Sequence, residues 1–212
     1  MRIGVQIWIA GALLFALLAA AAAIFDRFPG DERSARAVQD IDVPAFGGFV
    51  DTINWLGGTW PLAALIVMLA GAFLLRRAPL AAGLVLLTFV ARWLNSALQE
   101  LIGRPRPSPD LIDVTKQIDA GSFPSGHTVA LSVLFGLLFF LAPALVPWPL
   151  GRWALRAVCL LVIAAAGPAR VYIGVHWPSD VFGGYLLALL FLAPVISLYV
   201  ELFRRENVDS RA

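Results

Sequence analysis

Long apolar segments alternate with short polar segments along this chain, and the pattern predicts a helical membrane protein. Six apolar segments approach the roughly 20 residues that an α-helix needs to cross a bilayer. The predicted spans cover residues 3–25, 60–75, 79–102, 127–146, 157–173 and 178–202. We therefore expect an all-α fold, a polytopic membrane helical bundle with six transmembrane helices that forms a single domain over residues 1–212.

The N-terminal part of the chain contains three segments with weaker patterns. The first apolar run ends in small residues, Ala19–Ala23, that resemble a signal-peptide cleavage site. Because this run exceeds the ~7–15 residues of a signal h-region, we interpret it as a retained helix. Residues 26–43 are polar and charged, with a turn signal at Pro29-Gly30, and predict a loop. Residues 44–57 carry apolar side chains at helical spacing, which predicts either an amphipathic interfacial helix or an early start of the second span.

Composition supports a membrane protein and excludes several other classes. Hydrophobic residues make up 60% of the chain and charged residues 14%, which a soluble globular protein would not tolerate. Cys159 is the only cysteine in the sequence, so an internal disulfide and a thiolate metal cluster are excluded. The net charge of +2 is spread over loops without a basic stripe, which argues against nucleic acid as a partner.

The arginines between the predicted spans indicate how the protein is oriented. An even number of spans puts both termini on one side of the membrane, together with most of the arginines next to the spans. These are Arg2, Arg76, Arg77, Arg152, Arg156, Arg204 and Arg205. The positive-inside rule makes this side cytoplasmic, so the other polar loops are expected to face outward. The alanine-, arginine- and leucine-rich composition is typical of a bacterial inner-membrane protein, whose outward side is the periplasm.

Polar residues interrupt the second half of the third predicted span. Arg92, Ser96 and Gln99 fall on one helical face, and Asn95 lies beside them. Because polar groups at this depth are costly, they normally face a bundle interior or a water-filled cavity. For Asn95 and Ser96, the alternative is a hydrogen bond to a neighbouring helix.

A short polar motif, SFPSGH at residues 122–127, precedes the fourth predicted span. Pro124 favours an extended residue before it, Ser125 is a suitable N-cap, and Gly126 allows a ligand to approach the backbone. The free N–H groups and the positive dipole end of the following helix predict an anion site suited to phosphate. His127 lies in the first helical turn, where it can exchange protons with a bound group. The alternative is a histidine that only marks the membrane boundary.

A second histidine lies in the turn between the fifth and sixth predicted spans. His176 and Asp180 are four residues apart, and Pro178 suits the first turn of the sixth helix. A carboxylate at this spacing can fix the imidazole tautomer and leave the other ring nitrogen free as a nucleophile. The alternatives are that Asp180 only complements the helix dipole and that Arg170 is an interfacial anchor.

Together these residues predict phosphoryl-transfer chemistry. Two histidines, one with a carboxylate partner, lie with arginines and a helix N-terminus on the same predicted side of the membrane. Arginine suits bidentate contact with phosphate oxygens, and enzymes of this kind act largely by positioning and charge neutralisation. The sequence offers neither a carboxylate cluster for magnesium nor a Cys/His set for zinc, so we expect no metal and no other cofactor.

The order of three motifs resembles the type 2 phosphatidic acid phosphatase (lipid phosphate phosphatase) superfamily. The motifs are Arg106-Pro107, Pro124-Ser125-Gly126-His127 and Arg170-x5-His176-x3-Asp180. The resemblance implies that His176 attacks phosphorus to form a phosphohistidine, that Asp180 orients it, and that His127 protonates the leaving lipid alcohol. It also implies that the phosphoryl oxygens are held by Arg106, Arg170 and the backbone around Ser125 and Gly126.

Two positions depart from the family pattern. The first motif of the family begins with a lysine where this chain has Gln99, which can donate a hydrogen bond to phosphate but carries no charge. The third motif usually begins Ser-Arg, and here it is Ala169-Arg170. Arg92, two helical turns from Gln99, is a candidate source of the missing charge, although it lies about 10 Å deeper.

By resemblance, we expect a metal-independent membrane phosphatase that hydrolyses a phosphomonoester or a diphosphate of a lipid. Candidate substrates are phosphatidic acid, phosphatidylglycerophosphate and undecaprenyl pyrophosphate, and the expected partners are this lipid phosphate and the membrane lipids. Two alternatives stay open: a protein that binds or transports lipid phosphates without hydrolysis, and a lipid phosphotransferase. The sequence carries no signal for a particular oligomeric state.

Overall fold

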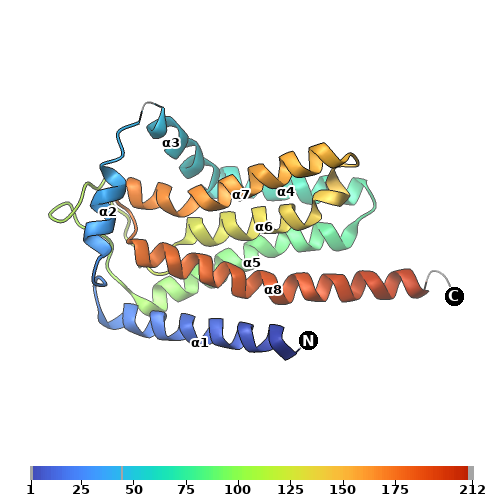
Figure 1. Cartoon of the computed structure of the whole chain (residues 1–212), viewed down its shortest axis with the longest axis horizontal. Coiled ribbons are helices and arrows are strands. Elements are labelled where there is room, and N and C mark those ends of the chain that lie inside the picture. The colour runs from blue at the N-terminus through green and yellow to red at the C-terminus, as the bar shows by residue number, and fades with distance from the viewer. Residues whose placement is uncertain (1, 44, 210–212) are drawn as a thin grey trace.

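Eight helices make up the described part of this chain, and they form a bundle (Figure 1). The computed structural model describes residues 2–43 and 45–209, with side chains described for residues 4–43 and 45–203. The helices are α1 (Arg2–Ile24), α2 (Asp31–Gln39), α3 (Phe46–Leu56), α4 (Thr59–Leu75), α5 (Pro79–Ile102), α6 (Gly126–Leu145), α7 (Pro149–Tyr172) and α8 (Pro178–Asp209). No strand occurs among the described residues, and the predicted all-α fold is confirmed.

Within the described residues, five helices are long and apolar enough to cross a membrane, namely α1, α5, α6, α7 and α8. The α3–α4 pair makes a sixth candidate span, bent by 64° at a short break. The first four predicted spans each match a helix to within one residue at both ends. The structure therefore confirms a polytopic helical bundle.

α6 lies in the centre of the bundle, between α5, α7 and α8 (Figure 1). Its sequence is apolar on every face, as expected for a helix that has no polar surroundings. Leu131, Leu134 and Leu137 are fully buried, so neighbouring helices rather than lipid cover these side chains. Because His127 lies in the first turn of α6, the core of the bundle fixes the position of this histidine.

The segment of residues 44–57 forms a short helix of its own, α3, which counts as part of a span only together with α4; its first residue, Pro44, lies outside the described part. Two glycines follow α3, and α4 then begins at Thr59 in a direction 64° away. An added Cβ at Gly57 would lie 2.5 Å from Cδ2 of His127, so this close passage requires glycine. The break therefore brings the start of α4 next to the first turn of α6.

α2 lies within residues 26–43, which the polar pattern predicts to be a loop, and that prediction is wrong. Asp31 and Glu32 in its first turn complement the helix dipole. Ala35 is fully buried in a small apolar cluster that includes Trp177. Contacts with the rest of the protein thus stabilise a helix whose own sequence is too polar to indicate one.

α7 begins at Pro149, although the sequence places the start of this span at residue 157, and the predicted start is wrong. Arg152 and Arg156 suggest a loop, yet both lie in the first turns of the helix. Their guanidinium groups donate hydrogen bonds to carbonyl oxygens of residues 139–147, which satisfies the charged ends of the side chains. A proline at the first helical position also suits the start of a helix.

Different turns and loops lie at the two ends of the bundle (Figure 1). The start of α1, the end of α8, the α4–α5 turn and the α6–α7 turn lie at one end, whereas α2, the loop of residues 103–125 and the α7–α8 turn lie at the other. This separation of the arginine-rich turns from the motif residues matches the prediction. The side chains of Arg2, Arg204 and Arg205, which the predicted orientation also uses, lie outside the described side chains.

Candidate active site

A cavity of about 190 Å³ lies where the three motifs meet, and we name it the histidine cavity. It is lined by Arg92, Asn95, Ser96, Gln99, Arg106, Ile118, Ala120, Gly126, His127, Arg170 and His176. Six of the eight predicted site residues belong to this lining. The other two, Ser125 and Asp180, are fully buried beside it. Residues far apart in the sequence are thus brought around one small space.

His176 lies in the turn between α7 and α8 and is almost completely buried. Its Nε2 is 3.1 Å from Nη1 of Arg106, and its Nδ1 is 3.5 Å from Oδ2 of Asp180. Burial lowers the pKa of His176 to about 4, an effect that the Asp180 carboxylate partly opposes. The imidazole is therefore neutral at neutral pH. A proton on Nδ1, directed at Asp180, puts the lone pair on Nε2, where it accepts the hydrogen bond from Nη1 of Arg106 at the edge of the cavity.

The contact between Nδ1 and Asp180 is longer than an ordinary hydrogen bond. Among the described residues, Nδ1 has no hydrogen-bond partner within the usual limits. Contacts of this kind are often long without substrate and shorten when substrate binds. Asp180 cannot move freely to close the gap, because its Oδ2 also accepts a hydrogen bond of 2.8 Å from the Trp177 backbone N–H. We therefore expect the imidazole ring, rather than the carboxylate, to make the adjustment.

Arg104 binds Oδ1 of Asp180, the carboxylate oxygen that does not face His176. This arginine is not among the site residues predicted from the sequence. Its Nη1 is 2.5 Å from Oδ1 of Asp180, and its Nη2 is 2.9 Å from Oδ2 of Asp31 on α2. Asp31 also accepts hydrogen bonds from the backbone N–H and the hydroxyl of Ser179. The available signal for Arg104 was its place beside Arg106 in one Arg-Pro-Arg-Pro run, whereas nothing near Asp31 in the sequence marks it.

Arg106 and Arg170 are the two predicted phosphate-binding cations, and both reach the histidine cavity. Arg106 donates to the backbone oxygens of Ala120, Gly121 and Val175, which hold its guanidinium group beside His176. Burial lowers the pKa of Arg106, and Asp180 opposes this effect. A guanidinium group that has lost much of its water in this way gains strongly from an anionic ligand.

Arg170 lies in the last turn of α7 and is buried. Its Nη1 donates a hydrogen bond of 2.8 Å to Oδ1 of Asn54, which lies on α3 and was not predicted to take part. Its Nε is buried and has no hydrogen-bond partner in the described part of the chain. Since a buried donor without a partner is costly, this N–H group is available to a ligand oxygen.

Ser125 is the N-cap residue of α6, as predicted, but its side chain makes no capping hydrogen bond. Its hydroxyl oxygen instead accepts a hydrogen bond of 3.0 Å from Thr128, and its backbone N–H donates to the backbone oxygen of Asp180. The first N–H groups of α6 therefore have no side-chain acceptor at the N-cap and keep their capacity for an anion. An added Cβ at Gly126 would lie 3.0 Å from Nδ2 of Asn95, so glycine is needed for helix contact as well as for any ligand.

The polar face of α5 lines the histidine cavity, as predicted. Nε2 of Gln99 donates a hydrogen bond of 2.8 Å to the backbone oxygen of Pro124 and so supports the loop before α6. Nη2 of Arg92 donates to the Thr59 hydroxyl across 2.9 Å. The Ser96 hydroxyl bonds to a carbonyl of its own helix, so the alternative of a bond between helices is not what this side chain forms.

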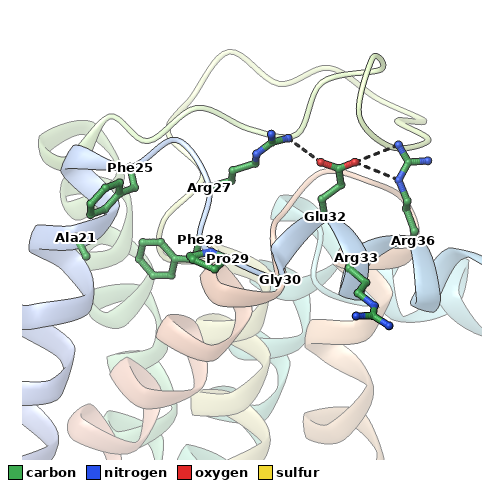
Figure 2. A pocket seen from close by; sticks show the side chains of 9 residues that line it. All are labelled: Ala21, Phe25, Arg27, Phe28, Pro29, Gly30, Glu32, Arg33 and Arg36. Carbon is green, nitrogen blue, oxygen red and sulfur yellow. Dashed lines mark hydrogen bonds and ion pairs between the residues drawn. The ribbon is translucent and has the colours of Figure 1, made fainter.

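A larger cavity of about 820 Å³ lies where α1 leads into α2 (Figure 2). Figure 2 shows Arg27 and Arg36 both joined to Glu32, while Arg33 points away from this cluster. The side chains around this space include no histidine, serine or cysteine that could act as a nucleophile. The chemistry is therefore assigned to the smaller histidine cavity.

The carboxylates near the histidine cavity are used by other side chains. Asp180 and Asp31 both pair with Arg104. In the described part of the chain, no group of three or more His, Cys, Asp or Glu side chains is arranged to hold a metal ion. The charged groups that line the cavity itself are arginines.

The sequence of this chain matches a protein-family model and is similar to known proteins. A sequence model of the PAP2 superfamily matches residues 80–204. Phosphatidylglycerophosphatase B of Bacillus subtilis (strain 168) is 31% identical over 198 residues, which cover 92% of this chain and 96% of that protein. The undecaprenyl-diphosphatase of Sulfolobus acidocaldarius is 36% identical over 66 residues, which are 31% of this chain and 28% of that protein.

A solved structure has the same arrangement of helices. The crystal structure of a transmembrane PAP2-type phosphatidylglycerolphosphate phosphatase from Bacillus subtilis superimposes with a TM-score of 0.77. The two proteins are 28% identical in sequence, and the match covers 92% of this chain and 96% of the other. The similarity therefore includes the N-terminal helices as well as the region that carries the motifs.

Proposed function

Because this chain belongs to the PAP2 superfamily, we propose that it is an integral membrane phosphatase that hydrolyses a phosphate ester or a diphosphate of a lipid. The observation that carries the proposal is the histidine cavity. There, His176 with its carboxylate partner shares one space with His127 and with two arginines, Arg106 and Arg170. A binding protein would need the arginines but would have no use for a neutral histidine held by a buried carboxylate.

In the proposed mechanism, Nε2 of His176 attacks phosphorus while the bond to the leaving oxygen breaks. His127 gives a proton to that oxygen, and the product is a phosphohistidine together with the free lipid alcohol or lipid monophosphate. His127, now neutral, then takes a proton from water, whose oxygen attacks phosphorus and breaks the P–N bond. Inorganic phosphate leaves and His176 is regenerated. Asp180 keeps the proton of His176 on Nδ1 throughout.

The positive groups around the cavity supply the charge stabilisation that the reaction needs. In this proposal Arg106, Arg170 and the N-terminus of α6 at Gly126 hold the three non-bridging oxygens, and their positions around one cavity support it. Since these groups neutralise the phosphoryl charge, the proposed reaction requires no metal ion. Gln99 is placed to donate one further hydrogen bond without adding charge, in addition to its bond to Pro124.

The proposed substrates are phosphatidic acid, phosphatidylglycerophosphate and undecaprenyl pyrophosphate. The names of the similar proteins support the second and third of these, and the apolar bundle supports a lipid that reaches the site from the bilayer. We further propose that the protein lies in a bacterial inner membrane with both termini in the cytoplasm and the histidine cavity facing the periplasm. The arginine-rich turns at the end of the bundle opposite the cavity support this orientation.

The test is phosphate release from these lipids by purified protein in detergent with EDTA present. We expect activity in EDTA, and no activity for His176→Ala with lipid substrates or with an activated aryl phosphate. Rapid quenching in alkali should trap a phosphohistidine in the unmodified protein and none in His176→Ala. Full activity of that variant would exclude His176 as the nucleophile, and loss of wild-type activity in EDTA would exclude the metal-free mechanism.

A further inference from the structure

Arg92 lines the histidine cavity but has no part in the proposed phosphohistidine mechanism. It lies on α5 seven residues before Gln99, which puts its Cα about 10 Å further from the end of the bundle that carries the motifs. The cavity therefore extends from Arg106 and His176 toward the interior of the membrane, and Arg92 marks its deeper side.

The charge of Arg92 has no anionic partner within the described part of the chain. None of the ion pairs there includes Arg92, and its guanidinium group donates to the uncharged hydroxyl of Thr59 at 2.9 Å. A cation within a membrane-spanning helix is costly, and such residues normally face a partner or a functional cavity. The cavity side of Arg92 is thus a place where an anion would be stabilised.

Arg92, which the Thr59 hydroxyl holds from outside the cavity lining, lies on the side of the cavity where the leaving group would pass. Thr59 follows the glycine break that contacts His127, the proposed proton donor to the leaving oxygen. In an in-line displacement, the leaving oxygen is opposite the attacking nitrogen of His176. The part of the substrate beyond that oxygen would therefore continue from His127 toward Arg92 and the bilayer interior.

We propose that Arg92, held in place by the Thr59 hydroxyl, binds a second phosphoryl group of the substrate, located between the scissile bond and the lipid tail. This inference rests on the proposed function and narrows its substrate class. A lipid diphosphate and phosphatidylglycerophosphate both carry a phosphoryl group at this position, whereas phosphatidic acid does not. With a diphosphate, Arg92 would also stabilise the negative charge that the leaving phosphate gains when the P–O bond breaks.

The experiment compares substrates that differ only in this second group. One arm uses farnesyl phosphate and farnesyl diphosphate, and the other uses phosphatidic acid and phosphatidylglycerophosphate with the same acyl chains. The variants are Arg92→Met and Arg92→Lys, and Arg156→Met on α7 is the matched control for loss of an arginine from a membrane helix. The readout is the ratio of kcat/KM for the substrate with two phosphoryl groups to that for its partner with one.

We expect Arg92→Met to lower this ratio by about 10- to 100-fold, the usual effect of losing a charge-assisted hydrogen bond. Arg92→Lys should retain part of the ratio, and Arg156→Met should leave it unchanged. A lower ratio in the farnesyl arm would identify the second group as part of a diphosphate. A lower ratio in the phosphatidic acid arm would identify it as a phosphodiester. Equal losses for both members of each pair, or no loss for any substrate, would overturn the inference.

A measurement on the unmodified protein keeps the test independent of how the variants fold. Methylenediphosphonate should inhibit hydrolysis of farnesyl phosphate more strongly than methylphosphonate does, because it can occupy both phosphate positions. Equal inhibition would count against the second position. Failure of the proposed function is distinct from these outcomes, since it would appear as full activity of His176→Ala or as no phosphate release from any lipid.

Discussion

Arg104 and Asp180 form an ion pair of 2.5 Å in which both side chains are 0% exposed. The second amino group of the same guanidinium binds Asp31, so one arginine joins the loop after α5 to the first turns of α2 and α8. One oxygen of Asp180 is thereby fixed by Arg104 and the other is directed toward His176. The direction of the His176 imidazole thus depends on a buried arginine that does not line the histidine cavity.

Replacing Arg104 with alanine is expected to lower both stability and activity. The change leaves the carboxylates of Asp31 and Asp180 buried without their cation, and breaking a buried ion pair in this way costs about 3–5 kcal/mol. Thermal unfolding in detergent measures the first effect and phosphate release measures the second. Arg104→Lys keeps the charge but not the forked geometry, so it should recover stability more fully than activity. A variant Arg104→Ala with wild-type Tm and rate would contradict this account.

His176 should titrate far below an ordinary histidine. Burial lowers its pKa from 6.5 to about 4, so the folded protein favours the neutral ring. The resulting contribution to stability is present above pH 6.5 and is lost as the pH falls toward 4. Because the chain has two histidines, His127→Gln leaves His176 as the only one for NMR, provided that the purification tag contains none.

The variant Asp180→Asn shows whether the carboxylate raises or lowers the pKa of His176. Asp180 raises the pKa of His176 against the dominant effect of burial, so its loss should lower the midpoint further. The ring nitrogen shifts should also report protonation on Nδ1 when Asp180 is present. A midpoint near 6.5 for His176 would mean that the ring is exposed to water, contrary to the structure.

A methyl group at Gly57 should impair the proton transfer that we propose for His127. In Gly57→Ala the new Cβ would lie 2.5 Å from Cδ2 of His127, so the ring must move. Loss of general acid catalysis typically costs 10²–10⁴-fold, and it should be largest for lipid substrates with poor leaving groups. His127→Ala should show the same dependence on the leaving group, when activated aryl phosphates are compared with lipid phosphates. Gly71→Ala on α4, where nothing lies within 4 Å of the added atom, is the control and should retain activity.

A lysine at position 99 tests the first departure from the family pattern. Gln99→Lys adds a positive charge to the lining of the histidine cavity and can still donate to the Pro124 backbone oxygen. We expect a several-fold lower KM for lipid phosphates, with less effect on kcat. Gln99→Met removes both the donor and the charge, so it should raise KM and lower Tm. If Gln99→Lys and Gln99→Met change KM in the same direction, charge at this position is not what limits binding.

The membrane helices could be predicted from sequence because helix surfaces that face lipid and helix surfaces that face the core of the bundle are both apolar, which produces long apolar runs. α6 is the simplest case, since its apolar residues cover every face and its start coincides with a motif. α2 could not be predicted, because its nine residues are polar and its stability comes from burial of Asp31 and Ala35 against distant parts of the chain. The predicted start of α7 is wrong because the charge of Arg152 suggests a loop. The sequence does not show that backbone carbonyl groups of the preceding turn accept hydrogen bonds from this side chain.

The family resemblance, which rested on three short motifs, is confirmed by the PAP2 match and by a similar solved structure. The residues that hold the motif side chains were harder to find. Asn54 and Asp31 lie outside any motif, and only the fold brings them to Arg170 and Arg104. The side-chain cap expected of Ser125 fails for a similar reason, because Thr128 engages its hydroxyl oxygen.

One acceptor of each of these two arginines, Asn54 for Arg170 and Asp31 for Arg104, lies upstream of residues 80–204, the region that the superfamily match covers. A fragment restricted to that region would keep both histidines, Asp180 and every arginine of the motifs. It would nevertheless release one guanidinium group from Asn54 and leave another with a single carboxylate. We therefore expect the smallest active form of this protein to begin before residue 31, well ahead of its first signature residue.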